Sequence, residues 1–169
     1  MNAIAAIDKN WGIGSGGGLL FRIPSDMSYF KKMTLGKTVI MGRKTLESLP
    51  GSRPLPGRDT IVLSGNPGFR AEGTFAAASL RALFEAVSGK ARGELFVCGG
   101  ESIYTLLLPY CTSAYLTKIE AETEADRFFP NLDRLPSWRI SEKSGLMEDG
   151  GLRFFFTKYE NRAPMPFPG

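Results

Sequence analysis

The sequence predicts an α/β fold built around a mostly parallel sheet. The early apolar runs, such as residues 38–42, are short and almost uninterrupted, which is typical of strands buried on both faces. These runs alternate with segments of helical spacing, as expected for strand–helix–strand units. The chain has 169 residues, 43% of them hydrophobic, so it is long enough for one sizeable core. We therefore expect a single domain over residues 1–160.

Hydrophobic periodicity and turn residues place the elements in order. The first strand is expected at residues 4–7, a glycine-rich loop follows at 12–18, and Pro24 opens a helix that extends to Thr34. The remaining expectations are a strand at 38–42, a short helix or turn at 43–48, a loop at 49–57, a strand at 60–64, a helix at 79–87, a strand at 94–98, a helix at 102–108, a strand at 114–119, and two antiparallel strands around 138–140 and 152–159. The tail at 161–169 contains three prolines and is expected to be mobile.

Composition excludes several classes of function. The basic residues are scattered rather than gathered in a run, so the net charge of +4 favours small anionic ligands over nucleic acid. The absence of histidine excludes Ser-His-Asp and Cys-His catalysis and every His-ligated metal site. Cys98 and Cys111 lack metal-binding spacing, so we expect no metal and no disulfide, as in a reducing cytoplasm. We expect no signal peptide and no membrane span.

Asp26 is the first candidate for chemistry. Residues three and four apart share a helix face, so Asp26, Phe30 and Met33 are expected on one side of the helix, with Met27 beside them. Loss of hydration among these apolar side chains would raise the pKa of the carboxyl group, which suits a proton donor or an anchor for a cationic heterocycle. An aspartate in a first helical turn can equally serve only to complement the helix dipole.

Residues 12–17 match the G-x-G-x-x-G pattern of dinucleotide-binding folds, but their context differs from that of such folds. A Rossmann fingerprint leads directly into a helix, whereas here residues 18–24 intervene. We therefore interpret the glycine-rich segment as a mobile lid that closes over a site and excludes water.

Two turns that follow predicted strands carry groups suited to anions. Residues 42–45 (GRKT) offer two cations, a hydroxyl and free N–H groups at a helix start, and Ser64 could add a second hydroxyl. Residues 98–104 (CGGESIY) place two glycines before a helix, which permits close approach of a pyrophosphate. A solvated basic turn and a plain strand-to-helix turn are the alternatives.

Arg58 closes a stiff loop, residues 53–58 (RPLPGR). A guanidinium held on such a loop could bind a substrate carboxylate with two hydrogen bonds. The alternative is an ordinary exposed loop arginine.

Taken together, these segments resemble the dihydrofolate reductase family over residues 4–159. The resemblance is carried by residues 23–27 (IPSDM), 39–45 (VIMGRKT), 53–58 (RPLPGR), 97–100 (VCGG), 115–117 (YLT) and 126–130 (DRFFP). Each motif is weak alone, but six in this order and spacing are specific. The resemblance implies a monomer with a central eight-stranded, mostly parallel sheet flanked by helices and a C-terminal antiparallel hairpin.

The resemblance also implies a reaction: hydride transfer from NADPH to C6 of 7,8-dihydrofolate, with protonation at N5 promoted by Asp26, to give tetrahydrofolate. Antifolate inhibitors would bind the same site, and nucleic acid and membrane are not expected partners. The implied catalytic positions are Asp26, Phe21, Thr117 and Tyr104. The implied substrate-binding positions are Ile4, Ala5, Met27, Phe30, Leu49, Leu55, Arg58 and Cys98. The implied cofactor-binding positions are Ala6, Ile13, Gly14, Leu19, Gly42, Arg43, Lys44, Thr45, Leu63, Ser64, Gly99, Gly100, Glu101, Ser102, Ile103 and Tyr104.

The chain departs from the family pattern at two of these positions. Phe21 stands where a tryptophan is common, and it lacks the indole N–H that usually helps to order a water near the substrate. Ser102 stands where some members carry a phosphate-binding arginine. The related reductase of riboflavin synthesis is a rival, but it lacks counterparts of Asp26 and Arg58. A basic nucleic-acid-binding module is the rival from another class, and no contiguous basic face supports it.

Overall fold

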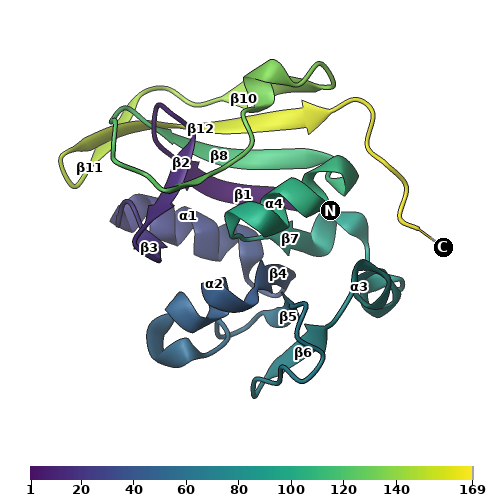
Figure 1. The fold of residues 1–169 in the computed structure, drawn as a ribbon. Coiled ribbons are helices and arrows are strands. Elements are labelled where there is room, and N and C mark those ends of the chain that lie inside the picture. Colours follow the sequence, from purple (N-terminus) through teal and green to yellow (C-terminus); the bar gives the residue numbers. More distant parts are fainter. Residues whose placement is uncertain (169) are drawn as a thin grey trace.

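A central sheet with strand order β10-β12-β8-β1-β7-β4-β5-β6 organises the computed structural model, which describes residues 1–168 (Figure 1). Its strands are β1 (Asn2–Ile7), β4 (Thr38–Gly42), β5 (Asp59–Leu63), β6 (Thr74–Ala77), β7 (Leu95–Val97), β8 (Ser113–Ile119), β10 (Trp138–Lys143) and β12 (Leu152–Asn161). The pairs from β8 to β6 are parallel, and β12 runs antiparallel to β8 and to β10. The predicted α/β class with a mostly parallel eight-stranded sheet is therefore confirmed.

Helices cover both faces of this sheet, because alternate residues of its apolar strands point to opposite sides. On one face Val39 and Met41 pack with Phe30 of α1 (Pro24–Thr34). On the other face Ile40 packs with residues of α3 (Leu80–Val87) and α4 (Glu101–Leu107). A short helix, α2 (Arg43–Ser48), continues directly from β4 and buries Leu46. Among residues 1–168, no helix has the length and apolar character needed to cross a membrane.

The glycine-rich segment differs from the loop that the sequence predicts. It forms a small hairpin of β2 (Gly12–Ser15) and β3 (Gly18–Leu19), and β2 also pairs with β9 (Arg127–Phe128). Gly16 and Gly17 make its turn with φ values of 59° and 82°, a region that favours glycine. Glycines carry no alternating hydrophobic pattern, so this segment has no strand signal in its sequence. The short strands β6 and β11 (Met147–Asp149) were also not predicted.

The tail contacts the domain through Phe167. This ring packs against Phe84 and Tyr110, with centroid distances of 4.8 and 6.5 Å, and Arg92 lies 4.2 Å above it. The N–H of Met165 donates to the carbonyl of Pro109 at 2.8 Å. The mobility expected of this segment remains a prediction, and residue 169 lies outside the described residues.

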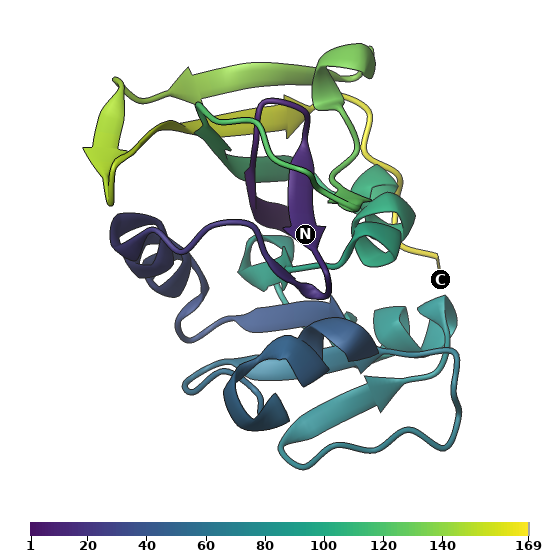
Figure 2. The same cartoon turned by 60° about the vertical axis from the view of Figure 1, so that its left-hand side comes forward.

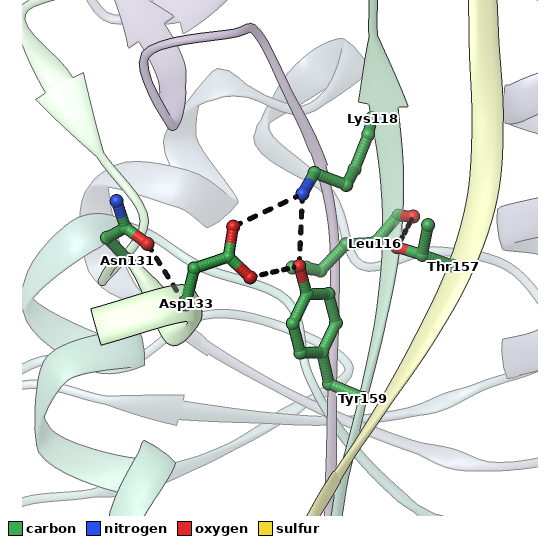
Figure 3. Close-up of polar contacts among 6 residues, drawn as sticks. All are labelled: Leu116, Lys118, Asn131, Asp133, Thr157 and Tyr159. Carbon is green, nitrogen blue, oxygen red and sulfur yellow. Dashed lines mark hydrogen bonds and ion pairs between the residues drawn. The ribbon is translucent and has the colours of Figure 1, made fainter. Parts of the chain in front are cut away.

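Polar contacts anchor β8 to its neighbours (Figure 3). The Thr157 hydroxyl on β12 donates to the Leu116 carbonyl at 2.7 Å. Figure 3 also shows Lys118, Asp133 and Tyr159 directed toward one another: Lys118 Nζ donates to the Tyr159 hydroxyl at 3.0 Å, which donates to Asp133 Oδ1 at 2.8 Å. These contacts fix the strand segment that carries Thr117, the residue between Leu116 and Lys118.

Candidate active site

A partly buried carboxylic acid forms the centre of the site. Thr117 on β8 is 2% exposed, and its hydroxyl donates to Asp26 Oδ1 on α1 at 2.5 Å. Burial raises the pKa of Asp26 above its ordinary value, and the hydrogen bond from Thr117 opposes this effect without cancelling it. The structure thus brings together two predicted catalytic residues that lie 91 positions apart in the chain.

An apolar cluster includes Ile23, the residue that precedes the helix carrying this acid. Ile23, the residue before α1, is buried with Ile119, and Phe21 and Ala6 pack against the same cluster. One turn after Asp26, the Tyr29 ring stacks on Phe156 at a centroid distance of 4.2 Å. Phe156 packs against the same apolar cluster as Phe21 and Ala6. Phe21 therefore packs as a purely apolar group against the cluster that contains Ile23, and its place beside the acid stays a prediction. Met27 differs from its neighbours, because its side chain is 53% exposed.

Ile4, in the middle of β1, forms a hydrogen bond with α4, the helix on the face of the sheet opposite α1. The hydroxyl of the buried Tyr104 on α4 donates to the Ile4 carbonyl at 2.7 Å. Burial raises the pKa of Tyr104 well above its ordinary value, so this hydroxyl stays a donor. The carbonyl of Ile4 has a second lone pair and can still accept from a ligand. Cys98 lies at the end of β7, and burial raises the pKa of its thiol to about 12, so it is an inert neutral group.

The two turns predicted to bind anions lie side by side. The peptide bond between Gly99 and Gly100 is cis, and the N–H of Gly42 donates to the Gly99 carbonyl at 2.9 Å. A Cβ built on Gly100 would lie 3.5 Å from the Thr45 hydroxyl, and one on Gly42 would lie 3.0 Å from Ile103. The missing side chain of Gly42 therefore leaves room for Ile103 where the β4–α2 and β7–α4 turns meet, whereas a Cβ on Gly100 would make only an ordinary contact.

Several side chains of this region have protein partners. Arg43 donates to Glu47 at 2.8 Å within α2, and the Glu101 carboxylate accepts from the N–H of Phe128 on β9 at 3.2 Å. The hydroxyl of Ser64, at the end of β5, accepts from the N–H of Asn66 at 3.2 Å. Lys44 and Ser102 are exposed, whereas Ile103 and Leu63 are buried in the core. The exposed Arg43–Glu47 pair is weakly stabilising and leaves the guanidinium available to a stronger anion.

Arg58 is held in a defined place beside α1. Its Nη1 donates to the Thr34 hydroxyl at 3.3 Å, and its Nε donates to the Pro56 carbonyl at 3.0 Å. Partial burial lowers the pKa of Arg58 slightly from its very high ordinary value, so it remains a cation. Leu49 and Leu55 are partly buried near the same loop. The arginine is oriented by its loop, as the sequence predicts for a carboxylate-binding group.

The glycine hairpin is joined to the domain by two carboxylates that sequence reasoning did not single out. Asp8 is 2% exposed and accepts from the N–H of Gly12 at 2.7 Å and from the hydroxyl of Thr123 at 2.7 Å. Burial would raise the pKa of Asp8, but its hydrogen bonds outweigh burial and lower it. Asp126 accepts from the N–H of Gly16 at 3.0 Å. The signal in the sequence that could have identified Asp8 is its position at the end of a predicted strand, four residues before Gly12.

Of the predicted hairpin positions, Ile13 is partly buried and packs against the core. Leu19 is 72% exposed, and Gly14 pairs with it across the hairpin. Ala5, on β1, is partly buried beside the core. Leu19 and Met27 are the exposed large apolar side chains among the predicted site positions, and Arg43, Lys44 and Ser102 are exposed polar ones.

Fold and site together define an α/β enzyme that places a buried acid and a fixed arginine near a pair of glycine turns suited to phosphate groups. A family model described as dihydrofolate reductase matches residues 1–161. The dihydrofolate reductases of Bacillus subtilis (strain 168) and Neisseria meningitidis serogroup B are 40% and 41% identical to this chain; the alignments cover 94% and 92% of it and 93% and 94% of those proteins. The chain belongs to the dihydrofolate reductase family, a family of oxidoreductases.

A solved structure supports the same assignment. Dihydrofolate reductase from Enterococcus faecalis, in complex with NADP(H) and RAB-propyl, matches with a TM-score of 0.82 and 31% identity. The match covers 95% of this chain and 95% of that one.

Proposed function

We propose that this enzyme reduces 7,8-dihydrofolate to 5,6,7,8-tetrahydrofolate with NADPH, and that Asp26 promotes protonation at N5. The observation that carries this proposal is the partly buried Asp26 carboxyl group, whose pKa is raised and which is held by Thr117 at 2.5 Å. An acid with this pKa retains a proton closer to neutral pH than an exposed aspartate does. When ionised, the same carboxylate can pair with the amidine edge of a pterin.

The cofactor assignment is supported by the two adjacent glycine turns and by the complex of the Enterococcus faecalis relative. Thr45 and the turn at Gly99 and Gly100 would hold the pyrophosphate, since a Cβ on Gly100 would fill the space facing the Thr45 hydroxyl. Arg43 and Ser64 would bind the 2′-phosphate, which distinguishes NADPH from NADH. Bound NADPH supplies the hydride, and the protein supplies orientation, exclusion of water and the proton.

The substrate would lie between Asp26 and Arg58. Phe30 and Leu55 would pack on its rings, and the Ile4 and Cys98 carbonyls would face the pterin edge. Arg58, already oriented by Thr34 and Pro56, would bind the glutamate α-carboxylate without the cost of ordering a free side chain. We propose the same pocket for antifolate inhibitors, and we propose a monomer that acts in the cytoplasm without nucleic-acid or membrane partners.

The test is NADPH oxidation by the purified protein with dihydrofolate, followed by absorbance. We expect Asp26→Asn to lower turnover near neutral pH by roughly 10²–10⁴-fold, while the Kd for NADPH stays unchanged. Asp59→Asn, which alters an exposed carboxylate paired with Lys90, is the matched control and should retain activity. Unchanged turnover in Asp26→Asn would remove Asp26 from the mechanism. Tight NADPH binding without any dihydrofolate turnover by the wild type would favour the riboflavin-type reductase.

A further inference from the structure

The catalytic helix α1 begins without a side-chain cap of its own. The residue at its N-cap position is Ile23, which provides no capping hydrogen bond, and Pro24 at the first position has no N–H. The first N–H of the helix that needs a partner is therefore that of Ser25, the residue immediately before Asp26. An uncapped N–H in a partly buried first turn weakens the turn that carries the acid.

The missing cap is provided by a distant element. Asp149 ends β11, and its Oδ2 accepts from the N–H of Ser25 at 2.8 Å. Gly150 and Gly151, with φ values of 59° and 75°, form the tight turn that leads from Asp149 into β12 and aims its carboxylate at the helix. In both ribbon views β11 and α1 lie at the same end of the molecule (Figure 2). The negative charge also complements the positive end of the helix dipole.

A second attachment lies on the other side of Asp26. Tyr29 stacks on Phe156 with an interplanar angle of 28°, and Phe156 pairs in register with Thr117 on β8. Strand β12 thus contacts α1 through Phe156 and Tyr29, which follows Asp26 in the helix. The β11–β12 hairpin contacts α1 through Asp149 and Ser25, which precedes Asp26. Asp26 lies between these two contacts along the helix, and its carboxyl group accepts from the hydroxyl of Thr117.

We propose that Asp149 is a positioning residue for the catalytic acid: by capping α1 at Ser25, it holds the Asp26 carboxyl group buried against Thr117. This inference deepens the proposed function and rests on it for its kinetic readout. Asp149 would touch neither substrate nor cofactor, and it would act only through Asp26.

Charged and titratable groups near this end of α1 are consistent with that role. Hydrogen bonding from Ser25 lowers the pKa of Asp149, so it stays an acceptor at neutral pH. Tyr29 faces Asp26 and also Tyr115, Glu142 and Lys158. Burial raises the pKa of Tyr29 further above neutrality, so it does not titrate together with Asp26.

The test compares Asp149→Ala, Asp149→Asn and a control, Glu148→Ala, which changes the exposed preceding residue of the same strand. The pKa of Asp26 is followed by carboxyl ¹³C NMR, and kcat and KM for dihydrofolate and the Kd for NADPH are followed as functions of pH. In Asp149→Ala we expect the pKa of Asp26 to fall toward its ordinary value, because burial is the larger influence and is relieved. We expect kcat at neutral pH to fall roughly tenfold, with the Kd for NADPH unchanged.

Asp149→Asn keeps an oxygen that accepts the Ser25 N–H but removes the charge. We expect it to restore both the pKa of Asp26 and kcat to near the wild-type values, and Glu148→Ala to match the wild type throughout. An unchanged pKa of Asp26 in Asp149→Ala would overturn the proposal, as would an Asn variant as impaired as the Ala variant. The NMR titration needs no turnover, so it still decides the role of Asp149 if the wild type proves inactive on dihydrofolate.

Discussion

Replacing Thr117 by valine tests how the structure sets the acid's protonation. The substitution keeps the shape of a side chain that is 2% exposed but removes the hydroxyl that donates to Asp26 at 2.5 Å. A hydrogen bond to a charged group contributes about 1.5–3 kcal/mol, against about 1 kcal/mol for a neutral pair. The ionised form of Asp26 should therefore lose about 1–2 kcal/mol more than the protonated form, which raises its pKa by about one unit.

This shift predicts the sign of a stability effect. The pKa of Asp26 is raised in the folded protein, so its contribution to stability is fully present below the pKa of the unfolded chain and is lost as pH rises through the folded pKa. Thr117→Val raises the folded pKa further and enlarges that loss. We expect the variant to lose about 2–3 kcal/mol of unfolding free energy near pH 8 and about 1 kcal/mol at roughly pH 3.5, below the unperturbed pKa of about 3.9.

The assay is urea unfolding at both pH values, with Thr157→Val as the matched control. Thr157 is also 2% exposed, on the neighbouring strand, but its hydroxyl donates to the neutral Leu116 carbonyl at 2.7 Å (Figure 3). Its loss should cost about 1 kcal/mol at either pH. If both variants show the same pH dependence, the Thr117 hydrogen bond does not set the pKa of Asp26, and the reasoning is refuted.

Two further predictions concern the cations of the site. Arg58→Leu should raise the KM for dihydrofolate by roughly 10- to 100-fold, with little change in the Kd for NADPH. The control is Arg53→Leu, which changes an exposed arginine of the same loop. Equal effects of Arg58→Leu on both ligands would refute the assignment. Arg43→Ala should reduce the preference for NADPH over NADH at least about tenfold. The control is Arg81→Ala, which breaks an equivalent exposed i,i+4 pair with Glu85 at 2.8 Å and should leave the preference for NADPH over NADH unchanged. An unchanged preference in Arg43→Ala would count against the 2′-phosphate site.

The buried strands and the catalytic helix could be predicted from the sequence because their signals are local. Strand β4 (TVIMG) is an uninterrupted apolar run between turn residues, and Pro24 marks the start of α1. Strand β6 (TFAA) could not be predicted, since it is short and exposes Phe75, so packing against β5 alone decides its conformation. The glycine hairpin was missed for a related reason: its pairing rests on backbone hydrogen bonds, to which glycine side chains add no pattern.

The acid could be predicted from local spacing, but Thr117 could be predicted only through the family resemblance and Asp149 could not be predicted at all. Helical spacing places Asp26 on an apolar face, whereas Thr117 and Asp149 lie 91 and 124 residues from their partners. Such contacts depend on the register of β8 with β12 and on the length of the β11–β12 hairpin, which no local pattern encodes. Asp8 illustrates the same limit, because its role is visible only once Thr123 is brought beside Gly12.

Strand β1 explains how the two halves of the site come to act on one reaction. Ile4 accepts from Tyr104 on the α4 side, and Ala6, two residues later, pairs in register with Thr117 and packs near Phe21 on the acid side. Successive residues of a strand differ by only about 3.3 Å in rise, so these two positions of β1 lie close together. In the mechanism that we propose, a hydride donor held by the α4 turn and a proton donor held by α1 would act on one heterocycle, and β1, at the centre of the sheet, would keep their separation fixed.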